Sequence, residues 1–277
     1  MGIQLATITL IGHDKAGVIA RITQLLFQLG ANIEAMEEAV TRGQFSMTLQ
    51  ASWAKGKFQQ ALIQESLRDA ARDLKMEVKI HFAPVGPQRL GILVTKEPHV
   101  LEGLLTKKAL GARPVVVIGN RSDLAPVAKK HKLPFYHVPW LNRPRAEEQV
   151  LKLAEKYEVN FIVLARFMKI LSPNFVWRWK NKIINIHPSL LPAFPGANAY
   201  RQAYERGVKI VGVTAHFVTP NLDEGPIIAQ EALVVRGNES LASIVKRGQA
   251  METKCVLRAV RAYVTKRLDV HWGRVYS

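Results

Sequence analysis

Residues 183–192 read IINIHPSLLP, and this stretch places two polar side chains at the end of a buried strand. Ile183 to His187 has the apolar, β-branched composition of a strand, and Pro188 ends it because proline cannot donate to a sheet ladder. Asn185 and His187 are two positions apart, so their side chains point to the same face. Buried polar groups need partners. The pattern therefore indicates either a satisfied structural pair or a reaction site.

Outward from this stretch, residues 89–277 alternate short apolar strands with amphipathic helices. The predicted strands are 89–94, 113–119, 135–138, 161–165, 183–187 and 212–218. The predicted helices are 99–110, 122–132, 145–158 and 243–267. This alternation predicts an α/β fold with a doubly wound, mostly parallel sheet. Ligands of such sheets bind beyond the carboxyl ends of the strands, where His187 would lie.

The first 84 residues have a different order of elements. The predicted strands are 5–11, 33–40, 44–52 and 76–82, and the predicted helices are 18–29 and 57–74. This βαββαβ order is typical of a ferredoxin-like domain. We therefore predict one domain at 1–84, a linker rich in Pro and Gly at 85–88, and a second domain at 89–277.

The composition is that of a soluble globular protein, with 277 residues, 48% hydrophobic and 22% charged. No apolar run is long enough to cross a bilayer, and no secretory signal precedes the first strand. The single cysteine, Cys255, excludes an internal disulfide framework. We expect a cytoplasmic protein without a membrane partner.

Nearly all of the excess positive charge lies in the second domain. Residues 1–84 hold 9 Lys and Arg against 8 Asp and Glu, whereas residues 85–277 hold 30 against 14. This excess indicates an acidic partner such as nucleic acid, phosphate or a polycarboxylate. The alternative is a basic surface that serves only solubility.

A second polar segment follows the predicted strand 212–218. Residues 221–226 read NLDEGP, a loop with two carboxylates. Asp223 near Asn185 and His187 would suit hydrolysis or transfer of an acyl group, since a carboxylate can position a nucleophile while the other two stabilise an oxyanion.

Three ordered motifs are similar to those of the folate-dependent formyltransferase family. They are NIHPSLLP at 185–192 with FPGA at 194–197, GVKIVGVTAHFV at 207–218, and LDEGPII at 222–228. The resemblance implies that Asn185, His187 and Asp223 are the catalytic residues. It also implies a substrate-binding set made up of Arg166, Phe167, Met168, Lys169, Ile170, Leu171, His216 and Gly225. Folate would be the substrate, with no cofactor and no metal.

The first domain resembles the ACT domain, a regulatory module that often binds amino acids. The resemblance depends on GHDKAGV at 12–18 and GANI at 30–33. It implies an amino-acid effector at Asp14, Ala16 and Gly17, where backbone N–H groups at a helix N-terminus stabilise a carboxylate. It also implies a symmetric homo-oligomer such as a tetramer.

An ACT domain ahead of this catalytic domain resembles the branch of the family that hydrolyses 10-formyltetrahydrofolate to tetrahydrofolate and formate. Residues 94–101, VTKEPHVL, are similar to a segment of that branch, and Pro98 argues against a phosphate-binding loop there. Pro188 departs from it, since the hydrolytic branch usually has a second His at this position. The alternatives are transfer to glycinamide ribonucleotide or methionyl-tRNA, and a non-catalytic amino-acid sensor. We expect no nucleic-acid partner, because the basic residues after Asp223 are dispersed.

Overall fold

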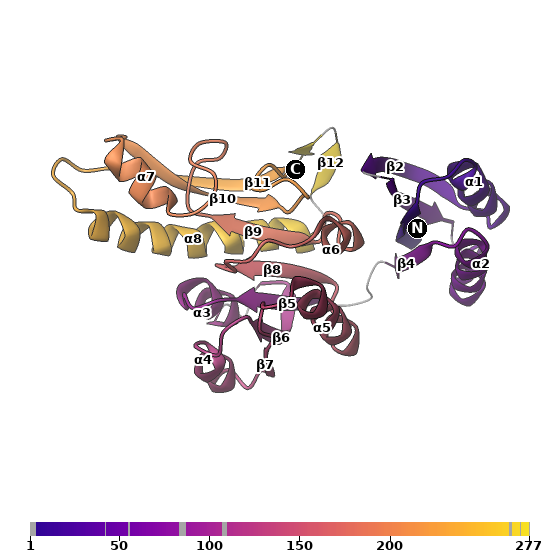
Figure 1. Cartoon of the computed structure of the whole chain (residues 1–277), viewed down its shortest axis with the longest axis horizontal. Helices are drawn as coiled ribbons and strands as arrows, with labels where there is room; N and C mark the ends of the chain where they lie inside the picture. The colour runs from indigo at the N-terminus through magenta and orange to yellow at the C-terminus, as the bar shows by residue number, and fades with distance from the viewer. Residues whose placement is uncertain are drawn as a thin grey trace. The chain divides into compact units, whose positions relative to one another are not determined.

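The structure is a computed structural model, and it describes residues 4–41, 43–54, 56–82, 87–106, 110–265, 268–271 and 273–276. The chain divides into two compact units, Met1–Val85 and Gly86–Ser277 (Figure 1). Of the predicted linker 85–88, residues 85 and 86 lie outside the described residues, and Gln88 is the first residue of a strand. The described part of the chain contains no helix long and apolar enough to cross a membrane.

The first unit has the predicted βαββαβ order. Its elements are β1 (Gln4–His13), α1 (Val18–Gln28), β2 (Asn32–Thr41), β3 (Gln44–Trp53), α2 (Gln60–Asp73) and β4 (Glu77–Phe82). The four strands form an antiparallel sheet in the order β2-β3-β1-β4. Strand β1 contributes Ala6, Ile8 and Leu10 to the hydrophobic core, and α1 buries Val18, Ile22 and Leu26 at four-residue intervals. Both helices therefore pack on one face of the sheet, as their apolar spacing predicts.

The second unit is built on a seven-stranded sheet. Its elements are β5 (Gln88–Val94), α3 (His99–Thr106), β6 (Ala112–Gly119), α4 (Ala125–Lys130), β7 (Phe135–His137), α5 (Arg143–Lys156), β8 (Phe161–Ala165), α6 (Pro173–Arg178), β9 (Ile183–His187), α7 (Ala199–Glu205), β10 (Ile210–Phe217), β11 (Ile227–Val234), α8 (Leu241–Val264), β12 (Asp269–His271) and β13 (Arg274–Tyr276). The strand order is β11-β10-β9-β8-β5-β6-β7. The chain starts at β5, moves outward to β7 and returns to β8 on the other side of β5. The carboxyl ends of β5 and β8 thus flank a topological switch point, where α/β folds bind ligands.

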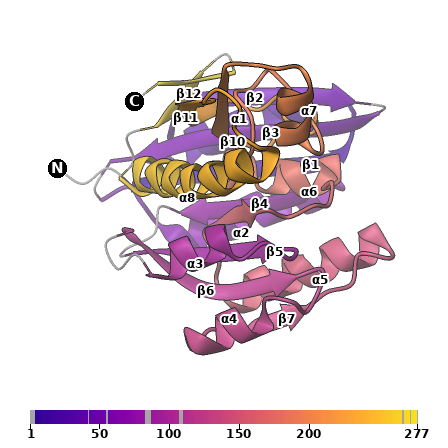
Figure 2. The same ribbon diagram turned by 90° about the vertical axis from the view of Figure 1, so that its left-hand side faces the viewer.

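Helices cover both faces of this sheet. Helices α3, α4, α7 and α8 share one hydrophobic cluster with the strands, and α5 and α6 share a second cluster on the opposite face. Figure 2 shows α3 and α8 side by side, and these two helices are in contact. The predicted α/β class and the doubly wound arrangement are confirmed.

The structure differs from the sequence prediction at several elements. Strand β10 runs antiparallel to both of its neighbours, β9 and β11, and the prediction omitted β11, α6, α7 and the hairpin β12–β13. The predicted helix 99–110 ends at Thr106, with 107–109 outside the described residues, and the predicted helix 243–267 runs from Leu241 to Val264. The omitted helices have six and seven residues, which is too short for a clear apolar period.

Candidate active site

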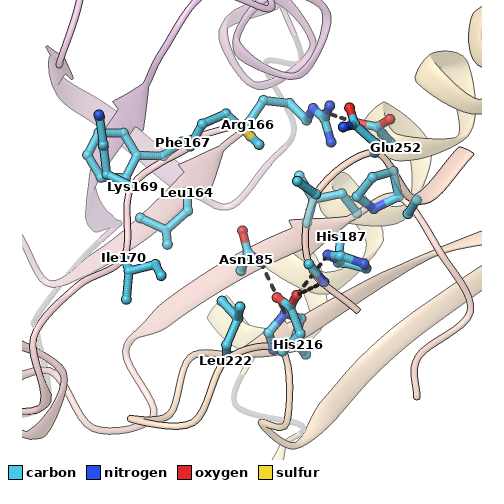
Figure 3. Close-up of a pocket in the computed structure, with 18 of the residues that line it drawn as sticks. Leu164, Arg166, Phe167, Lys169, Ile170, Asn185, His187, His216, Leu222 and Glu252 are labelled. Carbon is cyan, nitrogen blue, oxygen red and sulfur yellow. Dashed lines mark hydrogen bonds and ion pairs between the residues drawn. The ribbon is translucent and has the colours of Figure 1, made fainter. Parts of the chain in front are cut away.

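A cavity of about 570 Å³ lies at the switch point of the second unit. Its lining includes Glu97 after β5, the segment 166–171 after β8, and Pro188 after β9. The volume is within the range of cavities that hold small molecules. The side chains of Asn185, His187, His216 and Asp223 also line it, so the fold brings the three predicted catalytic residues to one cavity (Figure 3).

Both ring nitrogens of His187 have partners. Nε2 lies 3.0 Å from the carbonyl oxygen of Phe194, which can only accept, so Nε2 carries a proton and donates it. Nδ1 lies 3.3 Å from Oδ2 of Asp223. A second ring proton would therefore lie at Nδ1, where the carboxylate stabilises the positive charge. His187 and Asp223 form a unit that can hold a proton beside the cavity.

Asp223 is held from the backbone of another loop. Its Oδ2 accepts a hydrogen bond of 2.9 Å from the N–H of Gly196, and its side chain is 5% exposed. Its own backbone is left-handed, with φ of 57°, a conformation that aspartate tolerates better than most residues. The other carboxylate oxygen, Oδ1, lies 3.8 Å from Nε2 of His216, beyond hydrogen-bond distance. Oδ2 therefore holds the Asp223 side chain in place, while the lone pairs of Oδ1 remain available to accept a hydrogen bond.

His216 orients Asn185. Nδ1 of His216 donates to the carbonyl oxygen of Phe217 at 2.8 Å, which leaves Nε2 as an acceptor for the Asn185 amide at 3.1 Å. Burial lowers the pKa of His216 below its usual range, so the ring stays neutral and keeps this tautomer. Figure 3 shows the amide oxygen of Asn185 directed away from His216. One N–H of Asn185 is thus used by His216, and the second remains for another acceptor.

The segment 166–171 is anchored at two points, within the segment and just after it. The N–H of Met168 donates to Oγ1 of Thr95 at 2.9 Å. At the far end, the N–H and hydroxyl of Ser172 donate to the buried carboxylate of Glu147 at 2.6 and 2.5 Å. The backbone of this segment is thus held at fixed positions beside the cavity.

The side chains of this segment differ in their exposure. Phe167 and Leu171 are buried, whereas Met168 and Ile170 are 52% and 60% exposed. Exposed apolar side chains next to a cavity are suited to contact with an apolar ligand ring. All six residues of the segment line the cavity, which is the placement expected for the predicted substrate-binding residues.

Comparisons with known proteins agree with this architecture. The family model for formyl transferases matches residues 88–260, and the model for ACT domains matches residues 4–81. Formyltetrahydrofolate deformylase from Escherichia coli (strain K12) is 37% identical over 268 residues, which cover 94% of both chains. The enzyme of the same name from Bacillus subtilis (strain 168) is 36% identical, covering 93% of this chain and 88% of its own.

The chain belongs to the formyltetrahydrofolate deformylase family.

Solved structures support this membership. A formyltetrahydrofolate deformylase from Pseudomonas syringae pv. tomato is similar with a TM-score of 0.67 and 29% identity, covering 99% of this chain and 94% of its own. A glycinamide ribonucleotide transformylase from Symbiobacterium toebii has a TM-score of 0.66 and 32% identity, but it covers only 71% of this chain. The deformylase family therefore shares both units with this protein, whereas the transformylase covers a smaller part.

Among the predicted substrate-binding residues of this deformylase-family chain, Gly225 does not belong to the described lining of the cavity. A Cβ at this position would lie 1.7 Å from the carbonyl oxygen of Phe217, so only glycine lets the loop of Asp223 pack against the end of β10. Gly225 thus affects the site by allowing the backbone path of the loop that carries Asp223.

Among the acidic residues that line the cavity, sequence reasoning missed Glu252. This residue of α8 has 0% exposure and lines the cavity. It lies on the same helix face as Ile244, Gly248 and Val256, which are also buried. A carboxylate at a position of the apolar face is expensive to bury without partners, and that signal could have identified it.

The predicted effector loop lies in the first unit. Asp14, Ala16 and Gly17 are exposed, and Gly17 precedes α1 with a left-handed φ of 86°. No side chain caps this end of α1, so its first N–H groups are open to a carboxylate. Elsewhere, the described residues contain no group of three or more His, Cys, Asp or Glu side chains arranged to hold a metal ion.

Proposed function

We propose that this protein hydrolyses 10-formyltetrahydrofolate to tetrahydrofolate and formate. The observation that carries the proposal is the Asn185, His187 and Asp223 group at a cavity of suitable size, in a chain that matches deformylases over both units. The catalytic roles below are proposals, supported by the contacts of each side chain.

The pterin ring lies against the segment 166–171, and the formyl group points toward Asn185. Oδ1 of Asp223 accepts a hydrogen bond from a water molecule, because Oδ2 is already engaged by Gly196 and His187. The water oxygen bonds to the formyl carbon, and Asp223 assists the departure of its proton. Nδ1–H of His187 and the second N–H of Asn185 donate to the developing oxyanion.

The intermediate then breaks its bond between carbon and the folate nitrogen. That nitrogen takes a proton, which the His187 and Asp223 pair can supply from Nδ1. The proton that Asp223 took from water then passes to Nδ1 of His187 and restores the pair, while the released formic acid gives its own proton to solvent as it ionises to formate. Atoms balance with water as the only second reactant.

The direct test is formate release from 10-formyltetrahydrofolate by purified protein with no amine added. We expect stoichiometric formate and tetrahydrofolate. An absence of formate under these conditions, from folded protein, would show that the proposed reaction is wrong.

Two properties of the first unit extend the proposal. The exposed loop of Asp14, Ala16 and Gly17 binds the carboxylate of an amino-acid effector at the open end of α1. Strand β2, at one edge of its sheet, pairs with a second copy of the chain, which is supported by the half-exposed Met36 and Val40 on this ten-residue strand. Isothermal titration with glycine or methionine tests the effector site. A monomeric mass by light scattering would contradict the homo-oligomer.

We further propose that the reaction takes place in the cytoplasm and that its formate supplies one-carbon units for purine synthesis. The lone, buried Cys255 is compatible with a reducing compartment. Loss of the gene product should create a growth requirement for formate or purines. Unchanged growth without them would contradict this role.

A further inference from the structure

The buried carboxylate of Glu252 is engaged by three other side chains. Its Oε1 accepts a hydrogen bond of 3.0 Å from the hydroxyl of Tyr200. Its Oε2 lies 2.9 Å from Nε2 of His99 and 3.6 Å from Nε of Arg166. These partners come from α7, the start of α3 and the loop after β8. A charge at 0% exposure is thus compensated within the protein.

This cluster lies at one end of the cavity, which we call the α8 end and define by Glu97, Tyr200, Gln249 and Glu252. Figure 3 shows Arg166 and Glu252 on one side of Asn185 and His187, and Ile170 and Leu222 on the other. If the folate ring occupies the side of Ile170, a second reactant larger than water must reach the formyl carbon from the α8 end.

Helix α8 is shaped to receive Tyr200. A Cβ at Gly248, one turn before Glu252, would lie 2.2 Å from the Tyr200 hydroxyl oxygen. The glycine therefore leaves a notch in which the phenol packs and reaches the carboxylate. Burial raises the pKa of Tyr200, so its hydroxyl remains a donor at all ordinary pH values.

The second carboxylate at this end, that of Glu97, is also engaged. Its Oε2 accepts a hydrogen bond of 3.4 Å from Gln249. Glu97 and Pro98 immediately precede α3, so a carboxylate and a residue without an N–H occupy the position where a helix N-terminus would otherwise attract an anion. A phosphate group therefore meets the negative charge of Glu97 here instead of open N–H groups.

We propose that His99 and Tyr200, by engaging Glu252, close the α8 end to amine acceptors and leave water as the nucleophile. They are specificity-determining residues, not catalytic ones. The inference rests on the proposed hydrolysis and deepens it, because it identifies what selects water on a catalytic unit that structurally similar transformylases share.

The alternative reaction that these residues suppress is formyl transfer to an amine. A free Glu252 would hold the incoming ammonium by a charge-assisted hydrogen bond and take one proton from it. The neutral amine nitrogen would then bond to the formyl carbon while the bond to the folate nitrogen breaks. The second proton that the amine loses would pass to that folate nitrogen, and Glu252 would release its proton to solvent, so no other reactant is needed.

The test is the partition of the formyl group between water and glycinamide, which carries an amine but no phosphate. Formate and N-formylglycinamide are measured together in the wild type and in the double variant His99→Asn, Tyr200→Phe. We expect formate alone from the wild type. In the double variant the ratio of formylated amine to formate should rise about tenfold or more, as gain of one hydrogen bond to a charged group implies, while formate release stays within about threefold of wild type.

Tyr263→Phe is the matched control. Tyr263 is partly buried on α8, but its ring packs against Phe161 and Phe217, and it does not belong to the described cavity lining. Its ratio should equal that of the wild type. If the double variant fails to fold, the same ratio is measured in the single variant Tyr200→Phe, whose ring still fills the notch at Gly248.

Three results would overturn the inference. The ratio could stay unchanged in a folded variant that still releases formate, or the wild type could formylate glycinamide as readily as the variant. Folded variants could also lose formate release altogether, which would make His99 and Tyr200 part of the reaction itself. A wild type that releases no formate is a separate failure, that of the proposed hydrolysis, and the inference would fall with it.

Discussion

The carboxylate of Asp223 depends on neighbours from distant parts of the chain. Gly196 fixes Oδ2 through its N–H, His187 faces the same oxygen, and the left-handed backbone of Asp223 sets the direction of the side chain. These contacts join residues that are 27 and 36 positions away in the sequence. A single side chain thus has a defined role only because the end of β9 and the loop of Gly196 meet the loop that carries it.

Asp223→Asn is expected to lower the turnover number by about 10²–10⁴-fold, because the amide keeps the shape but can neither assist proton transfer nor stabilise a proton on His187. Formate release measures the effect, and thermal unfolding checks the fold. Glu224→Gln is the matched control, since Glu224 is exposed on the same loop and should retain wild-type turnover. Near-normal turnover of Asp223→Asn would show that the assigned role is wrong.

The buried, neutral His216 should make stability depend on pH. Its pKa is lowered in the folded state from an unfolded value of 6.5, so below that pH the unfolded chain binds the proton and the folded chain does not. The free energy of unfolding should therefore fall as the pH falls from 6.5 toward about 5. Urea unfolding of the wild type and of His216→Gln across this range measures it. Equal pH slopes in the two proteins would contradict the assignment.

At the scale of elements, the loop between β10 and β11 is positioned by close packing against the end of β10. Phe217 N–H donates to the carbonyl oxygen of Pro226 at 2.9 Å, and the backbone of Gly225 packs against the carbonyl oxygen of Phe217. The β-bulge at Ala215 and His216 accommodates the same turn. The position of Asp223 is therefore a property of this strand pair and not of the loop alone.

Gly225→Ala should displace this loop. The added methyl group would collide with the Phe217 carbonyl oxygen, and overpacking of this kind costs about 1–3 kcal/mol of stability. We expect a lower free energy of unfolding and a loss of formate release larger than the loss of stability alone explains. Gly237→Ala is the control, because a Cβ there meets no atom within 4 Å. A Gly225→Ala protein with wild-type activity would contradict the packing argument.

At the scale of the whole molecule, the charge is distributed unevenly along the chain. Residues 85–277 hold 30 Lys and Arg against 14 Asp and Glu, while residues 1–84 are nearly balanced. Several of these cations are paired on the surface, as with Lys254 and Arg258 beside Glu231. The remaining excess gives the catalytic unit a positive field that attracts anions over a distance.

This field predicts a salt-dependent affinity for polyglutamylated substrate. The KM for a folate with a long glutamate tail should rise as the ionic strength rises, because screening shortens the reach of the attraction. The KM for the monoglutamate should change much less, which serves as the internal comparison. Equal salt dependence for both substrates would leave the positive charge with a solubility role only.

The amino-acid sequence by itself determined the two-part organisation, the classes of both folds and the three polar residues Asn185, His187 and Asp223 that meet at the cavity. It could do so because strand and helix periods are local, and because the motifs at 185–192 and 222–228 are contiguous. The strand bounds 161–165 and 183–187 agree with the structure for the same reason. Helices of six or seven residues and the reversed direction of β10 were not predictable, because neither leaves a periodic signal.

Only the tertiary structure decided how the site residues are used. It shows that His216 takes one amide hydrogen of Asn185, that Gly196 holds Asp223, and that Gly225 shapes the loop instead of lining the cavity. It also gathers Glu252, Tyr200 and His99, which are up to 153 positions apart, into one buried cluster. Hydrogen bonds between side chains depend on positions in space and not on spacing along the chain, so no local pattern could supply them.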